Sequence, residues 1–408
     1  MGARSFSPTL LDPPRFELFL ETLLFFWNDR YDAHMLIGID ASRANREKKT
    51  GVEWYAYHLI RELQKIDQEK QHDWDLYTDR RLDGGLEQHA QNWHERFLSW
   101  PPRYLWTQAR LSYEMLRRPP QTLFVPVHVL PRIVPRRTVV TVHDVGFYRY
   151  PKLYTTSQNR YQRWSTKDML KRASAVITVS EYSRQELIHF CDADPDKLFV
   201  TYLGVDPVRY QRRTSEQAAP VLDALKISTP FFLYVGRLEA KKNTLLLLEA
   251  FHRYKQDHGV GDPYQLVLAG MPGAHYDEIA TVIARSPFRN QIHVTGYVSE
   301  DQKIALLSTA IALVHPAWYE GFGFTPLEAM LCECPVLCSR VASLPEVVGV
   351  DHALWFDPAD AENLTDALTR IVQDEELKRS LSSTGRAWAA KYSWSKTAEQ
   401  TFRLLTNS

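Results

Sequence analysis

The sequence predicts an α/β protein with two doubly wound, Rossmann-like domains that face each other across a cleft. Short apolar runs rich in β-branched residues alternate with helical patterns, which is typical of parallel sheets covered by helices on both faces. These runs form two sets, and a polar stretch without strand character separates them. The length of 408 residues agrees with two domains, because domains commonly contain about 100–200 residues.

We expect residues 1–34 to form an N-terminal extension. The apolar run Phe16–Trp27 is interrupted by Glu17 and Glu21, so it resembles an amphipathic helix more than a signal peptide. No apolar run reaches the roughly 18–20 residues of a membrane-spanning helix.

The first domain is predicted over residues 35–210. An apolar stripe at helical spacing between residues 52 and 66 predicts a helix after the first strand. The strands that we expect here are Met35–Ile39, Trp74–Thr78, Thr122–Val125, Thr138–Val142, Ala175–Val179 and Leu198–Tyr202.

A linker over residues 211–229 leads to a second domain over residues 230–388. A helix over Trp394–Leu405, within residues 389–408, is expected to cross back to the first domain. The expected strands of the second domain are Phe231–Val235, Gln265–Ala269, Gln291–Val294, Ile311–His315, Pro335–Cys338 and Ala353–Phe356.

Composition excludes several classes of protein. The chain is 44% hydrophobic, which excludes a disordered protein. Lys+Arg and Asp+Glu both total 49, so a wholly basic nucleic-acid binder is excluded and no nucleic-acid partner is expected. Four cysteines form no disulfide framework and indicate a reduced, cytoplasmic chain. Cys332, Cys334 and Cys338 lack a fourth ligand at metal spacing, so we expect them to pack in the core.

The densest group of functional residues follows the strand that ends at His315. Glu320 stands at the corner between this strand and a glycine loop, and Glu328 lies in the next helix. Thr325 at the N-cap and Glu328 at the third helical position would form a capping box, which is the purely structural alternative for Glu328. Backbone amides at such a helix start suit a phosphate group.

Two further groups follow strands at the expected cleft. Arg237 and Lys242 come after a buried strand, where two cations can hold a diphosphate; the alternative is two solvated surface cations. His143 and Asp144 come directly after a first-domain strand. The order Thr50-Gly51-Val52-Glu53 opens a helix with capping-box spacing, and Gly51 lets a ligand approach the backbone.

Together these segments resemble the retaining nucleotide-sugar glycosyltransferases of family 4, which have the GT-B fold. EGFGFTPLE resembles the paired glutamates of that family, and GRLEAKKN resembles its diphosphate clamp. TGVEWYAYHL resembles its first-domain glycine loop, although Gly51 stands alone where many relatives have two glycines. VHDVGFYRYP resembles its histidine motif. The resemblance covers residues 35–408 in the expected order.

This resemblance implies a role for each matching residue. Glu328 would bind the donor ribose, Arg237 and Lys242 the diphosphate, and Glu320 the transferred sugar. Amides near the sugar or phosphate would come from Gly321, Phe322, Gly323 and Phe324. His143 would hydrogen-bond the sugar or the diphosphate from across the cleft. The implied catalytic group is His143, Glu320, Arg237 and Lys242.

The remaining implications concern the acceptor side and the cofactors. Gly51 and Val52 would form an acceptor or phosphate loop. No Asp-x-Asp metal motif occurs, so no metal and no cofactor are expected besides the nucleotide-sugar substrate.

The expected function is retaining transfer of a hexose from a nucleotide-diphosphate sugar to a glycan or lipid-linked acceptor in cell-surface polysaccharide synthesis. GDP-mannose is the first expectation, because VHDVGFYRYP and the region around Trp106 resemble bacterial mannosyltransferases. The alternatives are a sugar-nucleotide epimerase on the same fold and a non-catalytic nucleotide-sugar-binding subunit. A nicotinamide dehydrogenase is disfavoured, because no G-x-G-x-x-G follows a strand.

A local excess of positive charge suggests a membrane contact. Residues 101–172 contain fourteen Lys+Arg and three acids. Within them, Arg160, Arg163, Lys167 and Lys171 fall on one helix face, which would attract an anionic membrane surface. The alternative is a solvated face paired with acids of the segment Glu53–Glu95.

Overall fold

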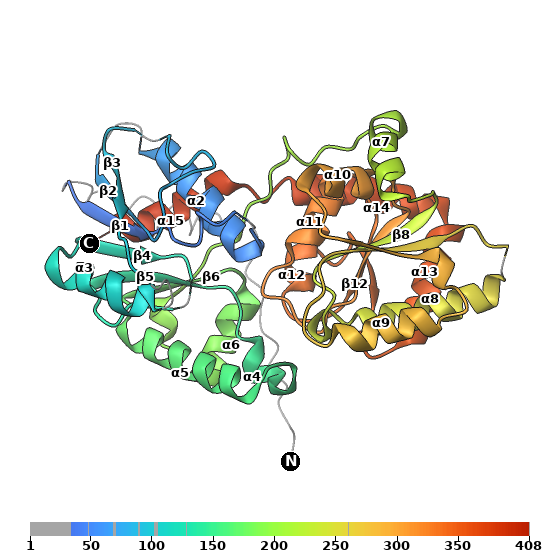
Figure 1. Cartoon of the computed structure of the whole chain (residues 1–408), viewed down its shortest axis with the longest axis horizontal. Helices are drawn as coiled ribbons and strands as arrows, with labels where there is room; N and C mark the ends of the chain where they lie inside the picture. The colour runs from blue at the N-terminus through green and yellow to red at the C-terminus, as the bar shows by residue number, and fades with distance from the viewer. Residues whose placement is uncertain are drawn as a thin grey trace, which may run out of the picture.

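The computed structural model describes residues 34–407 except 48, 68–70, 89, 102–104, 128 and 260. The extension predicted over residues 1–34, with its amphipathic run, therefore lies outside the described residues apart from His34. The described chain forms two α/β units side by side (Figure 1). None of the helices in this part of the chain has the length and apolar character needed to cross a bilayer.

The first domain contains a parallel sheet, which in the described residues has seven strands in the order β3-β2-β1-β4-β5-β6-β7. Its strands are β1 (Leu36–Asp40), β2 (Asp73–Thr78), β3 (Trp93–Phe97), β4 (Thr122–Val125), β5 (Arg137–Val142), β6 (Ala175–Thr178) and β7 (Leu198–Val200). Its helices are α2 (Gly51–Ile66), α3 (Ser112–Arg117), α4 (Gly146–Arg149), α5 (Thr156–Arg172) and α6 (Glu181–Cys191). Most central strand residues are buried, because helices cover both faces of the sheet.

Strand β3 is absent from the sequence prediction. Its sequence WHERF is largely polar, and only Trp93 is fully buried, stacked on Trp74 of β2 with ring centroids 4.4 Å apart. An edge strand needs little apolar character, so alternation of apolar residues does not reveal it.

The second domain contains another parallel sheet, with six strands among the described residues in the order β10-β9-β8-β11-β12-β13. These are β8 (Phe231–Val235), β9 (Gln265–Ala269), β10 (Ile292–Gly296), β11 (Ala312–His315), β12 (Val336–Ser339) and β13 (Leu354–Phe356). The helices are α8 (Thr244–His258), α9 (Tyr276–Arg285), α10 (Glu300–Thr309), α11 (Phe324–Leu331), α12 (Leu344–Val348), α13 (Ala361–Gln373) and α14 (Glu375–Ala389). Cys332, Cys334 and Cys338 are buried in its core, as predicted.

The segment between the two sheets contains a helix that its polar composition conceals. Helix α7 (Ser215–Leu225) begins after Thr214, whose side-chain oxygen accepts a hydrogen bond from the Gln217 amide at 3.3 Å. It packs against α10, so this part of the segment belongs with the second domain.

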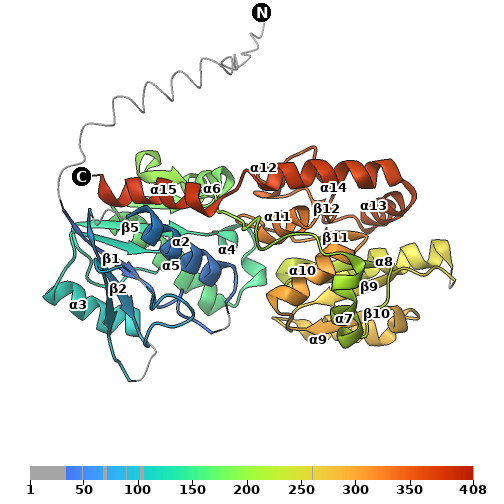
Figure 2. The ribbon, with the colours of Figure 1, turned by 90° about the horizontal axis from the view of Figure 1, so that it is seen from above.

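The C-terminal helix α15 (Trp394–Thr406) packs against α2 and β4 of the first domain. Figure 2 shows α14 over the second domain and α15 over the first. Its buried residues recur at helical spacing and include Ala398, Phe402 and Leu405. Thr122 and Arg137 fix its end, because their side chains donate to the carbonyls of Leu405 at 3.2 Å and Leu404 at 2.9 Å.

Candidate active site

A cavity of about 330 Å³ lies between the two domains. Its lining contains most of the site residues predicted from the sequence: Gly51, Val52, His143, Lys242, Glu320, Gly321, Phe322, Gly323, Phe324 and Glu328. The carboxyl ends of both parallel sheets reach this cavity, as the doubly wound architecture requires.

Glu320 and Lys242 meet at one wall of this cavity. They follow β11 and β8, which are neighbouring strands, and their side chains form an ion pair. His315 Nε2 also contacts the Glu320 carboxylate at 3.0 Å. Burial alone would raise the pKa of the Glu320 carboxyl, but Lys242 and His315 outweigh it and hold the pKa well below its usual range. Glu320 is therefore an ionised hydrogen-bond acceptor at neutral pH.

Arg237 does not join this group in the structure. It follows β8 at the same edge, but its side chain is exposed and lies outside the lining of the cavity. Among the described residues, no hydrogen bond or ion pair involves its guanidinium group.

The helix that carries Glu328 begins earlier than predicted, so the capping box of Thr325 and Glu328 is wrong. Helix α11 begins at Phe324, and Gly323 occupies the N-cap with a φ of 105°. This left-handed conformation suits glycine, and it moves the helix start ahead of Thr325. Glu328 then lies in the second turn, too far along to cap the first.

Glu328 instead takes part in a buried polar cluster. Tyr210 donates its hydroxyl to Glu328 Oε1 at 2.7 Å, and Lys303 Nζ lies 2.9 Å from Glu328 Oε2. Lys303 also lies 3.1 Å from Glu300. Burial alone would lower the pKa of Lys303, but the carboxylates of Glu328 and Glu300 outweigh it and raise the pKa. Tyr210 and Lys303 thereby fix the orientation of the Glu328 carboxylate.

Tyr210, Glu300 and Lys303 were not predicted as site residues. They come from the end of the first domain and from α10, and no short motif unites them. Only tertiary structure brings them to Glu328. Burial and the two carboxylates raise the pKa of Tyr210, so its hydroxyl stays protonated and able to donate.

The glycine loop before α11 lies directly against the first domain. A Cβ atom at Gly321 would lie 2.0 Å from the His143 carbonyl oxygen, so only glycine permits this approach. Ser180, at the N-cap of α6, donates its hydroxyl to the Gly321 carbonyl at 2.8 Å. The loop is thereby held between the two sheets.

Two further contacts join the domains beside the cavity. Lys241 and Asp144 form an ion pair at 3.2 Å. Burial alone would lower the pKa of Lys241, but the Asp144 carboxylate outweighs burial and raises this pKa. The carboxylate of Glu346 accepts hydrogen bonds from the first amides of α6, those of Glu181 at 2.7 Å and Tyr182 at 3.0 Å.

His143 reaches the cavity from the first domain. Its Nε2 lies 3.0 Å from the Pro126 carbonyl, which can only accept a hydrogen bond. In this contact Nε2 therefore carries the proton and donates it to the carbonyl.

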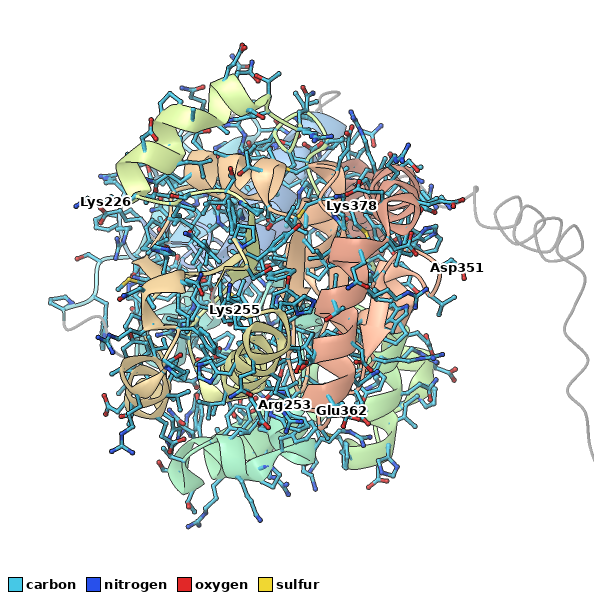
Figure 3. All side chains as sticks on the ribbon, turned by 90° about the vertical axis from the view of Figure 1, so that its right-hand side faces the viewer. Lys226, Arg253, Lys255, Asp351, Glu362 and Lys378 are labelled. Atoms are coloured by element: carbon cyan, nitrogen blue, oxygen red, sulfur yellow. The ribbon has the colours of Figure 1, made fainter. Side chains whose placement is uncertain are left out.

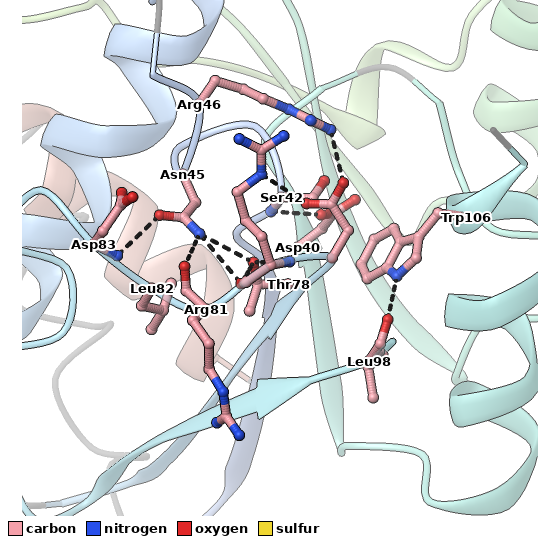
Figure 4. A network of polar contacts seen from close by, with 12 residues as sticks. Asp40, Ser42, Asn45, Arg46, Thr78, Arg81, Leu82, Asp83, Leu98 and Trp106 are labelled. Carbon is pink, nitrogen blue, oxygen red and sulfur yellow. Dashed lines mark hydrogen bonds and ion pairs between the residues drawn. The ribbon is translucent and has the colours of Figure 1, made fainter. Parts of the chain in front are cut away.

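The loop that precedes Gly51 is held by a polar network (Figure 4). Asn45 Nδ2 donates to the Arg81 carbonyl at 2.8 Å, and its Oδ1 accepts from the Asp83 amide at 3.1 Å. The amide of Thr50 then donates to the Glu53 carboxylate at 3.1 Å, the backbone half of the predicted capping box. This network places Gly51 and Val52 at the cavity.

An aromatic stack, which no sequence motif predicts, lies on the same side of the cavity. His58 of α2 lies between Trp54 and Trp394, with ring centroids 5.4 Å and 4.9 Å apart. Burial lowers the pKa of His58 to about 4, so its ring is neutral at physiological pH. Trp394 belongs to α15, and its place here depends on how that helix packs.

Comparison with known proteins identifies the class of this fold and site. The family described as "Glycosyltransferase Family 4" matches residues 49–209, and "Glycosyl transferases group 1" matches residues 224–388. The sucrose-phosphate synthase of Thermosynechococcus elongatus superposes with a TM-score of 0.73 at 20% identity, covering 91% of this chain and 98% of that one. HepE of Anabaena, solved in complex with UDP-glucose, gives 0.70 at 18% identity, covering 91% and 100%. These structures show the fold.

Relatives in sequence include bacterial mannosyltransferases. O-antigen chain mannosyltransferase B of Escherichia coli is 32% identical over 266 residues, which is 65% of this chain and 69% of the relative. The serotype-specific mannosyltransferase WbdA of Escherichia coli is 29% identical over 283 residues, 67% of this chain but only 34% of that protein. The chain belongs to glycosyltransferase family 4 and has the GT-B fold, as its motifs predicted.

Proposed function

We propose that the protein is a retaining hexosyltransferase that moves a hexose, with mannose as the first candidate, from a nucleotide-diphosphate sugar to a glycan or lipid-linked acceptor in cell-surface polysaccharide synthesis. The observation that carries this proposal is the convergence of Lys242, Glu320 and Glu328 with His143 in one interdomain cavity. The names of the sequence relatives support mannose and polysaccharide synthesis.

The donor diphosphate is assigned to the wall that carries Lys242. When the bond between the anomeric carbon and the diphosphate oxygen breaks, negative charge grows on the leaving diphosphate. The ammonium of Lys242 stabilises this charge more in the transition state than in the ground state. Arg237, exposed at the end of β8, is assigned to the outer part of the same clamp. Because these cations neutralise the leaving group, we expect turnover without a bound metal or cofactor.

The two glutamates are assigned to the two ends of the donor. The ionised Glu320 carboxylate accepts hydrogen bonds from hydroxyls of the transferred sugar, and the amides of Gly321 to Phe324 bind beside it. Glu328, fixed by Tyr210 and Lys303, accepts the ribose hydroxyls. His143 hydrogen-bonds the donor sugar or the diphosphate from the opposite domain, and Gly51 and Val52 border the acceptor or phosphate.

A peripheral membrane contact is assigned to α5. Among the described residues, none of Arg160, Arg163, Lys167 and Lys171 forms an ion pair with an acid. The described ion pairs of the segment Glu53–Glu95 instead involve cations outside α5, such as Arg43 and Arg96. Trp164 on this helix is 55% exposed, as expected for an aromatic side chain that inserts at a bilayer surface.

The test is incubation of the protein with GDP-mannose and other nucleotide sugars, followed by assay of nucleoside diphosphate release and of the transferred sugar. We expect release and transfer with one donor, undiminished by a metal chelator, with the anomeric configuration retained. Conversion of the donor into an epimer without release would establish the epimerase instead. Binding without any turnover, with acceptor glycan present, would indicate a non-catalytic subunit.

A further inference from the structure

A second hollow lies on the second domain, away from the interdomain cavity. It has a volume of about 1610 Å³ and lies between the segment 211–215 at the start of α7, the end of α10, and α14. In the part of the chain that the structure describes, no residue lines both this groove and the interdomain cavity, so the two are separate sites. Figure 3 views the molecule from this end and labels Lys378, on α14.

The lining of this groove is strongly basic. Its described cations are Arg212, Arg213, Lys378, Arg379 and Arg386, whereas Glu333 is the acid in its described lining. Arg213 and Lys378 pair with acids outside the lining, Asp301 and Glu375. Even with these two pairs, the five cations outnumber the three acids Glu333, Asp301 and Glu375, so the groove carries an excess of positive charge.

Two guanidinium groups of this lining share one carboxylate. Arg212 Nη1 lies 3.3 Å from Glu333 Oε2, and Arg386 Nη1 contacts Glu333 Oε1. The side chains of Arg212 and Arg386 are 57% and 51% exposed, so solvent screens both pairs and they contribute little to stability. An arriving dianion can compete with Glu333 for both arginines.

We propose that this groove binds a phosphate-bearing small molecule through Arg212 and Arg386. A planar guanidinium group donates two parallel hydrogen bonds that match phosphate oxygens, and two of them here converge from separate chain segments. The hollow is larger than the usual ligand pocket of about 300–1,000 Å³, so the phosphate occupies only the part beside the arginines. A ligand bound there bridges the segment between the domains to α14. This proposal does not rest on the donor site.

Inorganic pyrophosphate is the probe, titrated calorimetrically into the full-length protein. The wild type is expected to bind it at the groove and, separately, at the donor clamp. In Arg212→Gln with Arg386→Gln, affinity at the groove should fall by about tenfold or more, the scale of losing charge-assisted hydrogen bonds. A control with Arg285→Gln and Arg289→Gln removes the same charge from α9 and the turn after it, and should bind as the wild type does.

A second variant keeps the test valid if the double variant folds poorly. Glu333→Gln removes the competing carboxylate while both arginines remain, so pyrophosphate should bind the groove several-fold more tightly. Identical isotherms for the wild type, Glu333→Gln and the double arginine variant would overturn the proposal. If only Lys242→Ala changed the isotherm, the groove proposal would fall and the donor site would stand. If only the groove variants changed it, the groove would stand and the clamp assignment would fall.

Discussion

Lys242 and Glu320 form an ion pair at the wall of the interdomain cavity, although the chain places them on loops after different strands. Strands β8 and β11 are neighbours in the sheet, so the loops at their carboxyl ends lie side by side. The pairing joins a cation suited to a diphosphate to a carboxylate suited to a sugar. The site therefore has adjacent positions for a sugar and a diphosphate, the two groups joined by the bond that would break.

Replacement of Glu328 separates ligand binding from a structural role. Glu328→Gln should lower the free energy of unfolding, because the buried Lys303 loses one of its two carboxylate partners and keeps only Glu300. Donor KM should rise, because an amide offers fewer acceptor sites to the ribose hydroxyls than a carboxylate does. Steady-state kinetics and thermal unfolding of the same preparation measure both effects. Unchanged KM would show that Glu328 does not contact the donor.

His58 should make stability depend on pH. Its pKa falls from 6.5 in the unfolded chain to about 4 in the native protein, so the unfolded state binds more protons between these values. The free energy of unfolding is therefore greatest above pH 6.5 and decreases as the pH falls towards 4. In His58→Phe this contribution should vanish. Urea titrations between pH 4 and 7 compare the two proteins, and parallel curves would contradict the assignment.

Removal of the C-terminal helix should disrupt the first domain. Without residues 394–408, the apolar surfaces of α2 and β4 lose their cover and His58 loses one of its aromatic neighbours. We expect increased binding of a hydrophobic dye, aggregation in size-exclusion chromatography and loss of activity. A truncated protein that stays monodisperse and fully active would refute this role for α15.

The basic face of α5 should bind anionic membranes. Sedimentation with vesicles that contain anionic lipid should carry down the wild type, and added salt should weaken this binding. Changing Arg160, Arg163, Lys167 and Lys171 to Glu should abolish binding and leave donor hydrolysis unchanged. A variant with Arg285→Glu and Arg289→Glu, which lie on another surface, serves as the control. Equal sedimentation of the wild type and the four-site variant would rule out the contact.

Much of the fold could be predicted from sequence, because buried parallel strands appear as short apolar runs between helical patterns. The same reasoning missed β3, whose polar side chains resemble a loop, and it placed the N-cap of α11 at Thr325, whereas the helix begins at Phe324 after the N-cap Gly323. A glycine at positive φ can precede the first residue of a helix as well as a capping threonine can. The sequence alone does not show whether Gly323 or Thr325 is the N-cap of α11.

The candidate site was predicted in part for a similar reason. Residues in the loops that follow strands, such as His143 and Glu320, are brought together by the sheet edge, which the sequence pattern defines. The same cavity is also lined by three residues from unrelated places in the chain. Tyr210 lies at the domain boundary, Lys303 lies on one face of α10, and Trp394 begins the terminal helix α15. Their positions depend on packing between elements, and local sequence patterns do not encode it.

The assay of Lys242→Ala tests the central claim most directly. With the donor that supports turnover, nucleoside diphosphate release should fall by about 10²-fold or more, the usual effect of losing one preorganised charge stabiliser. Arg237→Ala should lower release through the same clamp, whereas exposed Lys226→Ala on the second domain should have no effect. Thermal unfolding confirms that each variant is folded. Near-normal release by both Lys242→Ala and Arg237→Ala would contradict the proposed donor site.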